Sequence, residues 1–380
     1  MRVLTIFGTR PEAIKLAPVI RELDKGAGFR SRLCITGQHR ELLDQVLRLF
    51  KLKPDFDLNV MLQNQSLFDL TTRILRGLES VFRDEKPDIV LLQGDTTTVL
   101  AACLAAHYLR IRIGHVEAGL RSFDKYNPFP EETNRRVADL LSDFHFAPTE
   151  AARQHLLKEG IAEQQIVVTG NTVIDALLMT LQRQADEQTQ RRFESHFQHE
   201  YGIPFDNKRV VLVTGHRRES FGAGFERICL GLRKIAEGNK NVAIVYPVHL
   251  NPNVKEPVFR ILGAVPNIHL IPPVEYASFV WLLSRSYVVL TDSGGIQEEA
   301  PSLSKPVLVM RSVTERTEAV EAGAAKLVGT DDHTIAAETQ RLLDDKETYL
   351  RMAQAANPYG DGKAGRRIVS FLEGRLLPKR

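Results

Sequence analysis

Short apolar runs alternate with longer amphipathic stretches along nearly the whole chain. The apolar runs have the length of buried strands, while the stretches between them carry apolar residues at helical spacing. Such alternation is typical of βαβ units, in which helices cover a parallel sheet. The runs predicted to form strands are VLTIF, RLCITG, DIVLLQG, RIGHVEAG, FHFAPT, QIVVTG, RVVLVTG, VAIVYPV, IHLIPP, YVVLTDSGG, PVLVM and AKLVG.

These runs fall into two series of about six strands, which predict an α/β protein with two Rossmann-like domains, each built on a parallel sheet. The first domain is expected over residues 1–170 and the second over residues 206–362. The stretch ADEQTQRRFESHFQHEYGIPFDNKR is polar and too poor in apolar residues for a strand, so residues 171–205 are expected to form a hinge or linker. The amphipathic pattern of residues 363–380 predicts a helix that crosses back to complete the first domain.

Composition and charge narrow the class of protein. The 380 residues are 43% hydrophobic, enough for a large core divided between two domains. The 50 Lys and Arg residues nearly balance the 47 Asp and Glu residues, so no charge excess points to nucleic acid or an anionic membrane surface. No segment approaches the ~20 apolar residues of a membrane span, and the first strand lacks the features of a signal peptide. The three cysteines lie within apolar patterns, which predicts free buried thiols and a cytoplasmic location: Cys34, Cys103 and Cys229.

Candidate chemistry lies directly after the predicted strands, because ligands of open parallel sheets bind beyond the carboxyl ends of the strands. After the first strand, GTRPEAIKLAP offers Gly8 for a tight turn, with Arg10 and Lys15 as basic groups. The alternative is an ordinary strand-to-helix turn whose basic residues face solvent. The G-x-G-x-x-G fingerprint of dinucleotide binding is absent from this turn.

Three carboxylates follow later strands of the first series or begin a helix. Asp95 lies in QGDTTT, Glu117 in GHVEAGLRS and Glu131 in PFPEETNR. If they converge, they raise one another's pKa values and supply acid and base groups near neutral pH. The alternatives are a helix cap for Asp95 and a favourable helix-dipole contact for Glu131.

The second series predicts an anion site. In TDSGGIQEEA, Ser293, Gly294 and Gly295 stand between a strand and a helix start, where free backbone N–H groups bind phosphate oxygens. His216 in TGHRRES and His249 in YPVHLNPN follow other strands of this series, as does Arg316 in TERTEAVEAG.

Together, these motifs resemble the non-hydrolysing UDP-N-acetylglucosamine 2-epimerases, in order and over essentially the whole chain. The resemblance implies the GT-B arrangement, in which the active site lies between two Rossmann-like domains, and a homodimer. It also implies that UDP-N-acetylglucosamine and UDP-N-acetylmannosamine are interconverted without NAD or a metal. The motifs that carry it are GTRPEAIKLAP, QGDTTT, GHVEAGLRS, PFPEETNR, TGNTVIDA, TGHRRES, YPVHLNPN, TDSGGIQEEAPSL and TERTEAVEAG.

Residue roles follow from the same resemblance. The acid and base groups would be Asp95, Glu117 and Glu131, with His216 counted among the catalytic residues. Glu299 would bind the ribose hydroxyls, whereas Glu298 would face elsewhere. Groups for UDP and the rest of the substrate would be Arg10, Lys15, His216, Ser293, Gly294, Gly295, Arg316 and Phe279.

A second molecule of substrate would act as an allosteric activator at Gln38, His39 and His249, by the same resemblance. For Gln38 and His39 a plain helix start is the alternative. Two positions depart from the family pattern: Thr317 stands where proline is frequent, and Val274 stands where some relatives have glutamine.

The chemistry requires an indirect route, because the proton on carbon 2 of the sugar is not adjacent to a carbonyl group. Elimination of UDP would give 2-acetamidoglucal. Re-addition of UDP, with a proton delivered to the opposite face of carbon 2, would give the epimer. The product would be used for cell-surface polysaccharide. The alternatives are a hydrolysing epimerase, a GT-B glycosyltransferase and a nucleotide-sugar sensor without catalysis. A sensor would have no use for three carboxylates. Analysis of the products distinguishes the hydrolysing epimerase from the non-hydrolysing one.

Overall fold

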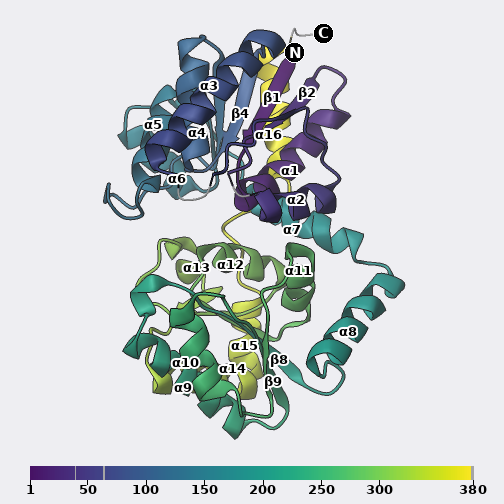
Figure 1. Ribbon diagram of the computed structural model, residues 1–380. Coiled ribbons are helices and arrows are strands. Elements are labelled where there is room, and N and C mark those ends of the chain that lie inside the picture. Colours follow the sequence, from purple (N-terminus) through teal and green to yellow (C-terminus); the bar gives the residue numbers. More distant parts are fainter. Residues whose placement is uncertain (39, 63–64, 378–380) are drawn as a thin grey trace. The chain divides into compact units, whose positions relative to one another are not determined.

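The computed structural model describes residues 1–38, 40–62 and 65–377. The chain forms two compact units, one made of Met1–Ala176 with the chain from Tyr359 onward, the other of Leu177–Pro358. Figure 1 shows that each unit is a sheet with helices packed around it. None of the described helices is long and apolar enough to cross a membrane.

The first unit contains a seven-stranded sheet in the order β3-β2-β1-β4-β5-β6-β7, and all its pairings are parallel. Strand β4 is buried along its whole length, as its continuous apolar sequence requires of a strand covered on both faces. The strands are β1 (Arg2–Phe7), β2 (Arg30–Ile35), β3 (Phe56–Asp57), β4 (Ile89–Gln93), β5 (Arg112–Val116), β6 (Phe144–Ala147) and β7 (Ile166–Val168).

Helices cover both faces of this sheet, and the C-terminal helix α16 packs beside α1 (Figure 1). Their contact is close because Gly365 lies on the backbone of Pro18, where a Cβ atom would be 3.2 Å from the Pro18 carbonyl. The helices are α1 (Arg10–Lys25), α2 (Arg40–Phe50), α3 (Leu67–Glu85), α4 (Thr97–Tyr108), α5 (Glu131–Leu141), α6 (Glu150–Lys158) and α16 (Ala364–Leu376). Helix α7 (Thr172–Arg183) begins in this unit and ends in the second one.

The second unit is also built on a parallel sheet, which has six strands in the order β10-β9-β8-β11-β12-β13. Its strands are β8 (Arg209–Thr214), β9 (Val242–Pro247), β10 (Ile268–Ile271), β11 (Val288–Thr291), β12 (Val307–Val309) and β13 (Ala325–Leu327). Its helices are α8 (Glu187–Tyr201), α9 (Ala223–Gly238), α10 (Pro252–Leu262), α11 (Tyr276–Arg285), α12 (Gly294–Glu299), α13 (Thr317–Glu321), α14 (Asp332–Asp344) and α15 (Lys346–Ala353).

Both sheets have the strand order of a Rossmann fold, so the prediction of two parallel-sheet Rossmann-like domains is confirmed. Strand β3, which has two residues and lies at the edge of the first sheet, is not among the predicted strand runs. Residues 171–205, expected as a hinge or linker, are largely helical. Within them α8 begins at the cap Asp186 and buries Phe197, whose ring stacks on Trp281 of α11 at 5.4 Å.

Candidate functional site

The strand order reverses between β1 and β4 in the first sheet and between β8 and β11 in the second. Loops at such a reversal point diverge and leave room for a ligand at the carboxyl ends of the strands. Most sequence-predicted site residues lie on these loops or on the helices that begin there: Arg10, Lys15, Asp95, His216, Ser293, Gly294, Gly295 and Glu299.

The loop after β1 is fastened to the loop after β4 by Glu12, a buried residue that sequence reasoning missed. Its carboxylate accepts hydrogen bonds from the backbone N–H groups of Gly8 (3.0 Å) and Thr9 (2.7 Å) and from the Thr96 hydroxyl (2.7 Å). Burial raises the pKa of Glu12, although these hydrogen bonds oppose the change. Arg10 is the first residue of α1, so this network fixes where its helix begins.

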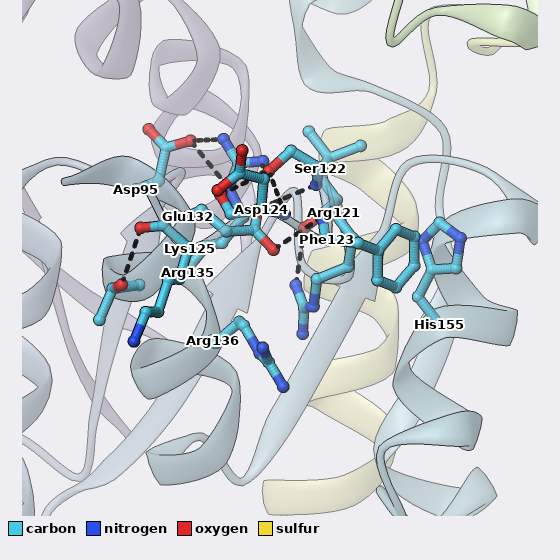
Figure 2. A network of polar contacts seen from close by, with 12 residues as sticks. Asp95, Arg121, Ser122, Phe123, Asp124, Lys125, Glu132, Arg135, Arg136 and His155 are labelled. Carbon is cyan, nitrogen blue, oxygen red and sulfur yellow. Dashed lines mark hydrogen bonds and ion pairs between the residues drawn. The ribbon is translucent and has the colours of Figure 1, made fainter. Parts of the chain in front are cut away.

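Asp95 is not the cap of α4. The cap is Thr96, whose hydroxyl accepts from the Val99 N–H at 3.4 Å, and this leaves the Asp95 carboxylate for another partner. That partner is Arg135 of α5, whose Nε lies 3.1 Å from Asp95 Oδ2 (Figure 2). The Asp95 carbonyl also accepts from Asn134 Nδ2 at 2.9 Å, so α5 holds both the backbone and the side chain of Asp95.

Glu117 is buried just after β5, and its backbone is in the left-handed region with φ of 67°. Lys15 Nζ lies 2.5 Å from Glu117 Oε1, and Asn171 Nδ2 lies 3.0 Å from the same oxygen. Gln93 at the end of β4 donates to the other carboxylate oxygen. Glu117 is therefore a carboxylate surrounded by donors, and Lys15, expected to hold phosphates, contacts it directly.

Glu131 is the first residue of α5 and is half-buried, whereas the next residue, Glu132, is fully buried. Glu132 accepts from the backbone N–H groups of Ser122 (2.9 Å) and Phe123 (3.3 Å), and it pairs with Arg135. Figure 2 shows how Arg135 thus links Asp95 to the loop before α5. Sequence spacing gave no signal for Arg135, because its partner Asp95 lies far away along the chain.

His216 is held by Asp292, which stands directly after β11 and is fully buried. Asp292 Oδ2 accepts from the backbone N–H groups of His216 (2.6 Å) and Arg217 (2.7 Å), while its Oδ1 lies 3.4 Å from His216 Nδ1. Burial lowers the pKa of His216, although Asp292 acts in the opposite direction. The sequence could have indicated Asp292 as a site residue, because it is the first polar residue beyond the strand.

The ring of His249 stacks on the ring of His216, with the centroids 5.5 Å apart. The resemblance assigned His216 to the nucleotide and His249 to an allosteric site, and the structure brings the two side chains together. His249 is exposed, and its Nδ1 accepts from the Asn251 N–H at 3.1 Å. Gln38, from the same expected allosteric group, accepts from the Thr98 hydroxyl at 3.1 Å, while His39 lies outside the described residues.

Helix α12 begins at Gly294, with Ser293 as its cap. A Cβ atom on Gly294 would lie 3.1 Å from Glu315 Oε1, so the close approach of this side chain favours glycine. Gly295 follows in the first turn, and its Cβ position is open except for Ser293 at 4.0 Å. The helix therefore begins with two residues that have no side chain, although Gly294 is buried beside the side chains of Glu315 and Arg316.

The two glutamates of α12 have different partners. Glu298 is buried and pairs with Arg316 Nε, while Glu299 Oε1 accepts from the hydroxyl of Tyr276 at 2.7 Å. Phe279 lies half-buried on α11, the helix that begins at Tyr276. Tyr276 and the contact between Glu298 and Arg316 were not expected from the sequence.

Two Rossmann-type sheets, each with its candidate site residues at the carboxyl ends of the strands, define a two-domain α/β protein. Comparisons with known proteins agree with this class. A family model described as UDP-N-acetylglucosamine 2-epimerase matches residues 21–373. The enzyme of that name from Salmonella typhimurium is 56% identical over 98% of each chain. The one from Escherichia coli K12 is 56% identical over 99% of this chain and 100% of its own.

Among solved structures, the UDP-GlcNAc 2-epimerase from Neisseria meningitidis bound to UDP-GlcNAc is similar with a TM-score of 0.91. It is 51% identical in sequence, and the match covers 99% of this chain and 100% of that one. The chain belongs to the UDP-N-acetylglucosamine 2-epimerase family, among its bacterial, non-hydrolysing members, and it is an isomerase.

Proposed function

We propose that this protein reversibly converts UDP-N-acetylglucosamine to UDP-N-acetylmannosamine by anti elimination of UDP and its re-addition. The observation that supports this most is the group of three carboxylates on one edge of the first unit: Asp95, Glu117 and Glu131. Simple nucleotide binding has no need of a buried carboxylate such as Glu117 between Lys15 and Asn171.

The first step would remove the proton from carbon 2 while the bond between carbon 1 and the UDP oxygen breaks. Its products are 2-acetamidoglucal and UDP, and the electron pair of the broken C–O bond leaves with UDP. In the second step UDP adds back to carbon 1 and a proton reaches the opposite face of carbon 2. The carboxylates would serve as base and acid for these transfers.

The departing diphosphate would be bound by positive groups and by the start of α12. Such fixed donors stabilise negative charge that grows on a leaving group without having to reorganise. In this proposal Glu298 orients Arg316 toward the phosphates, and Tyr276 orients Glu299 toward the ribose hydroxyls. The other groups for the nucleotide are Arg10, Lys15, His216, Ser293, Gly294 and Gly295, with Phe279 as a further contact.

The proposal requires that groups of both units act on one substrate, as in the GT-B arrangement. In this proposal the protein is a homodimer in the cytoplasm, and it requires neither NAD nor a metal. A second substrate molecule would activate the enzyme through Gln38, His39 and His249. The product would supply activated N-acetylmannosamine for cell-surface polysaccharide.

The test is NMR spectroscopy of the protein with UDP-N-acetylglucosamine in heavy water, without added NAD or metal. The expected product is UDP-N-acetylmannosamine with deuterium at carbon 2, and deuterium should also enter the substrate pool. Persistent release of UDP with free N-acetylmannosamine would mean hydrolysis, and an unchanged sugar would contradict the proposal. Asp95→Asn, Glu117→Gln and Glu131→Gln are each expected to reduce kcat by about 10²- to 10⁴-fold.

A further inference from the structure

A buried histidine that the proposed chemistry does not use lies between the strand ends that carry the carboxylates. His115 is on β5, two positions before Glu117, and its side chain is almost completely enclosed. Its Nδ1 lies 2.6 Å from Asp139 Oδ1, and its Nε2 lies 2.7 Å from the carbonyl oxygen of Gly94. Gly94 directly precedes Asp95, and Asp139 is on α5, the helix that begins at Glu131.

The two partners decide how many protons the ring carries. A carbonyl oxygen only accepts hydrogen bonds, so Nε2 must carry a proton to make its contact with Gly94. Asp139 Oδ2 accepts from Arg121 Nη2 at 2.7 Å and from the Gly119 N–H at 3.2 Å, as expected of an ionised carboxylate. An ionised Asp139 also only accepts, so Nδ1 must carry a proton as well.

The pKa directions agree with this geometry. Burial by itself would raise the pKa of Asp139, but His115 and Arg121 lower it to about 2. For His115, burial acts to lower the pKa, yet Asp139 and the Gly94 carbonyl outweigh it and the pKa is raised. Other titratable groups near Asp139 are Cys103 of α4 and His145 of β6.

We propose that His115 is a constantly protonated positioning residue, which joins the three loops that carry the catalytic carboxylates. Through Gly94 it fixes the backbone of Asp95, through its own strand it fixes Glu117, and through Asp139 it fixes the helix of Glu131. This inference rests on the proposed function for its kinetic consequence, but the charge of the ring depends on the fold alone.

Gly94 lies close to the carboxylate of Glu117, so a small displacement of the turn at Gly94 matters. A Cβ atom on Gly94 would lie 3.9 Å from Glu117 Oε2, so the turn that His115 holds borders the carboxylate itself. Gly94 has φ of 80° and Glu117 has φ of 67°, both in the left-handed region. A neutral ring could donate to only one of its two acceptors, and either the Asp95 turn or α5 would lose its attachment. Misplacement of a catalytic group by about 1 Å can reduce the rate by about 10²-fold.

The first measurement is the protonation of His115 in the wild-type protein, labelled with ¹⁵N in its histidine rings. Two-bond ¹H–¹⁵N spectra at about pH 8 should show both His115 nitrogens as protonated, with the signal assigned by its loss in His115→Gln. His145 is the internal control: it is also buried, burial lowers its pKa, and one of its nitrogens should be unprotonated. An unprotonated nitrogen in His115 at this pH would overturn the proposal.

The second measurement separates kcat from KM. In His115→Gln and in Asp139→Asn, kcat should fall by about 10- to 100-fold while KM changes by less than about threefold. The matched control is His269→Gln in the second unit, because His269 also lies on a strand and bonds a backbone carbonyl, that of Tyr201 at 3.1 Å. Its kcat should be unchanged.

In Asp139→Asn the His115 ring should also lose a proton, because the neutral amide no longer stabilises its positive charge. Folded variants with normal kcat would overturn the positioning role, as would failure of both variants to fold. The two proposals fail separately: a wild-type protein without epimerase activity contradicts the proposed function, whereas a neutral His115 in the wild type contradicts this inference.

Discussion

At the scale of single residues, the partner of a side chain decides its role more than its type does. Glu298 and Glu299 are consecutive in the chain, yet a helix turns by about 100° per residue and points them to different neighbours. Glu298 pairs with Arg316, and Glu299 accepts from Tyr276. The same holds for Asp95 and Thr96, since the threonine caps the helix and the aspartate contacts Arg135.

Glu298→Gln tests whether Arg316 is positioned by its buried partner. The change removes the negative charge and therefore the ion pair, so the buried guanidinium keeps at most a hydrogen bond to a neutral amide oxygen and is positioned less firmly. We expect KM for the UDP-sugar to rise about 10-fold, equivalent to about 1.4 kcal/mol of binding, with kcat changed by less than threefold.

The control for this change is Glu226→Gln. Glu226 pairs with Arg260 at an exposed surface of the same unit, where such pairs contribute little. Its kinetic constants should not change. Steady-state kinetics that show a loss of kcat with unchanged KM in Glu298→Gln would contradict the positioning of Arg316.

At the scale of elements, the ends of β1 and β2 and the start of α4 meet around Gly8. The hydroxyls of Thr36 and Thr98 hydrogen-bond to each other at 2.9 Å, and both lie in the space that a side chain on Gly8 would occupy. Thr98 also donates to Gln38. Glycine is therefore required here by close approach, and the turn it forms precedes Arg10.

Gly8→Ala should reduce the free energy of unfolding by about 1–3 kcal/mol, because the new methyl group forces the two threonines apart. Thermal or urea unfolding measures this change. Gly374→Ala in α16 is the control, since no atom lies within 4 Å of its Cβ position. Alanine there should leave stability unchanged or raise it by up to about 1 kcal/mol, because it is the better helix former. Equal effects in both variants would contradict the argument.

At the scale of the whole molecule, the chain passes from the first unit to the second after Ala176 and returns at Tyr359. The two passages are fastened side by side within the first unit. The Asn171 N–H donates to the Tyr359 carbonyl at 2.7 Å, and the Asp175 carboxylate accepts from the N–H groups that begin α16, including that of Gly365 at 2.8 Å.

Asp175 makes this attachment sensitive to pH. Burial raises its pKa to about 6, although the backbone N–H groups oppose the change. The folded state therefore binds this proton more tightly than the unfolded state, whose aspartate has a pKa of about 3.9. The stabilisation from Asp175 is complete below about pH 4 and is lost as the pH rises to about 6, by at most about 3 kcal/mol.

Asp175→Asn isolates this contribution, because asparagine can still accept from the start of α16 but does not titrate in this range. Urea unfolding of both proteins across the interval should show the wild type losing stability relative to the variant as the pH rises. A difference that stays constant, or that changes in the other direction, would contradict the raised pKa.

The alternation of apolar and amphipathic segments determined the fold class, because a parallel strand covered on both faces must be apolar along its length. It could not reveal β3, which is two residues long, or α8, whose polar sequence is ordered by a few aromatic contacts such as that between Phe197 and Trp281. Strand ends also located most of the candidate site residues, because the carboxyl ends of parallel strands meet at one edge of a sheet.

What only the tertiary structure decided is which groups surround those residues. Arg135 meets Asp95 across 40 positions of sequence, His216 meets Asp292 across 76, and His115 meets Asp139 across 24. Each of these contacts exists because the sheet brings separate loops or a following helix together, and no local pattern records that approach. The sequence by itself indicated where the candidate site residues lie along the chain. Tertiary packing decided the partners and charges of these groups, because hydrogen bonds and burial act through space.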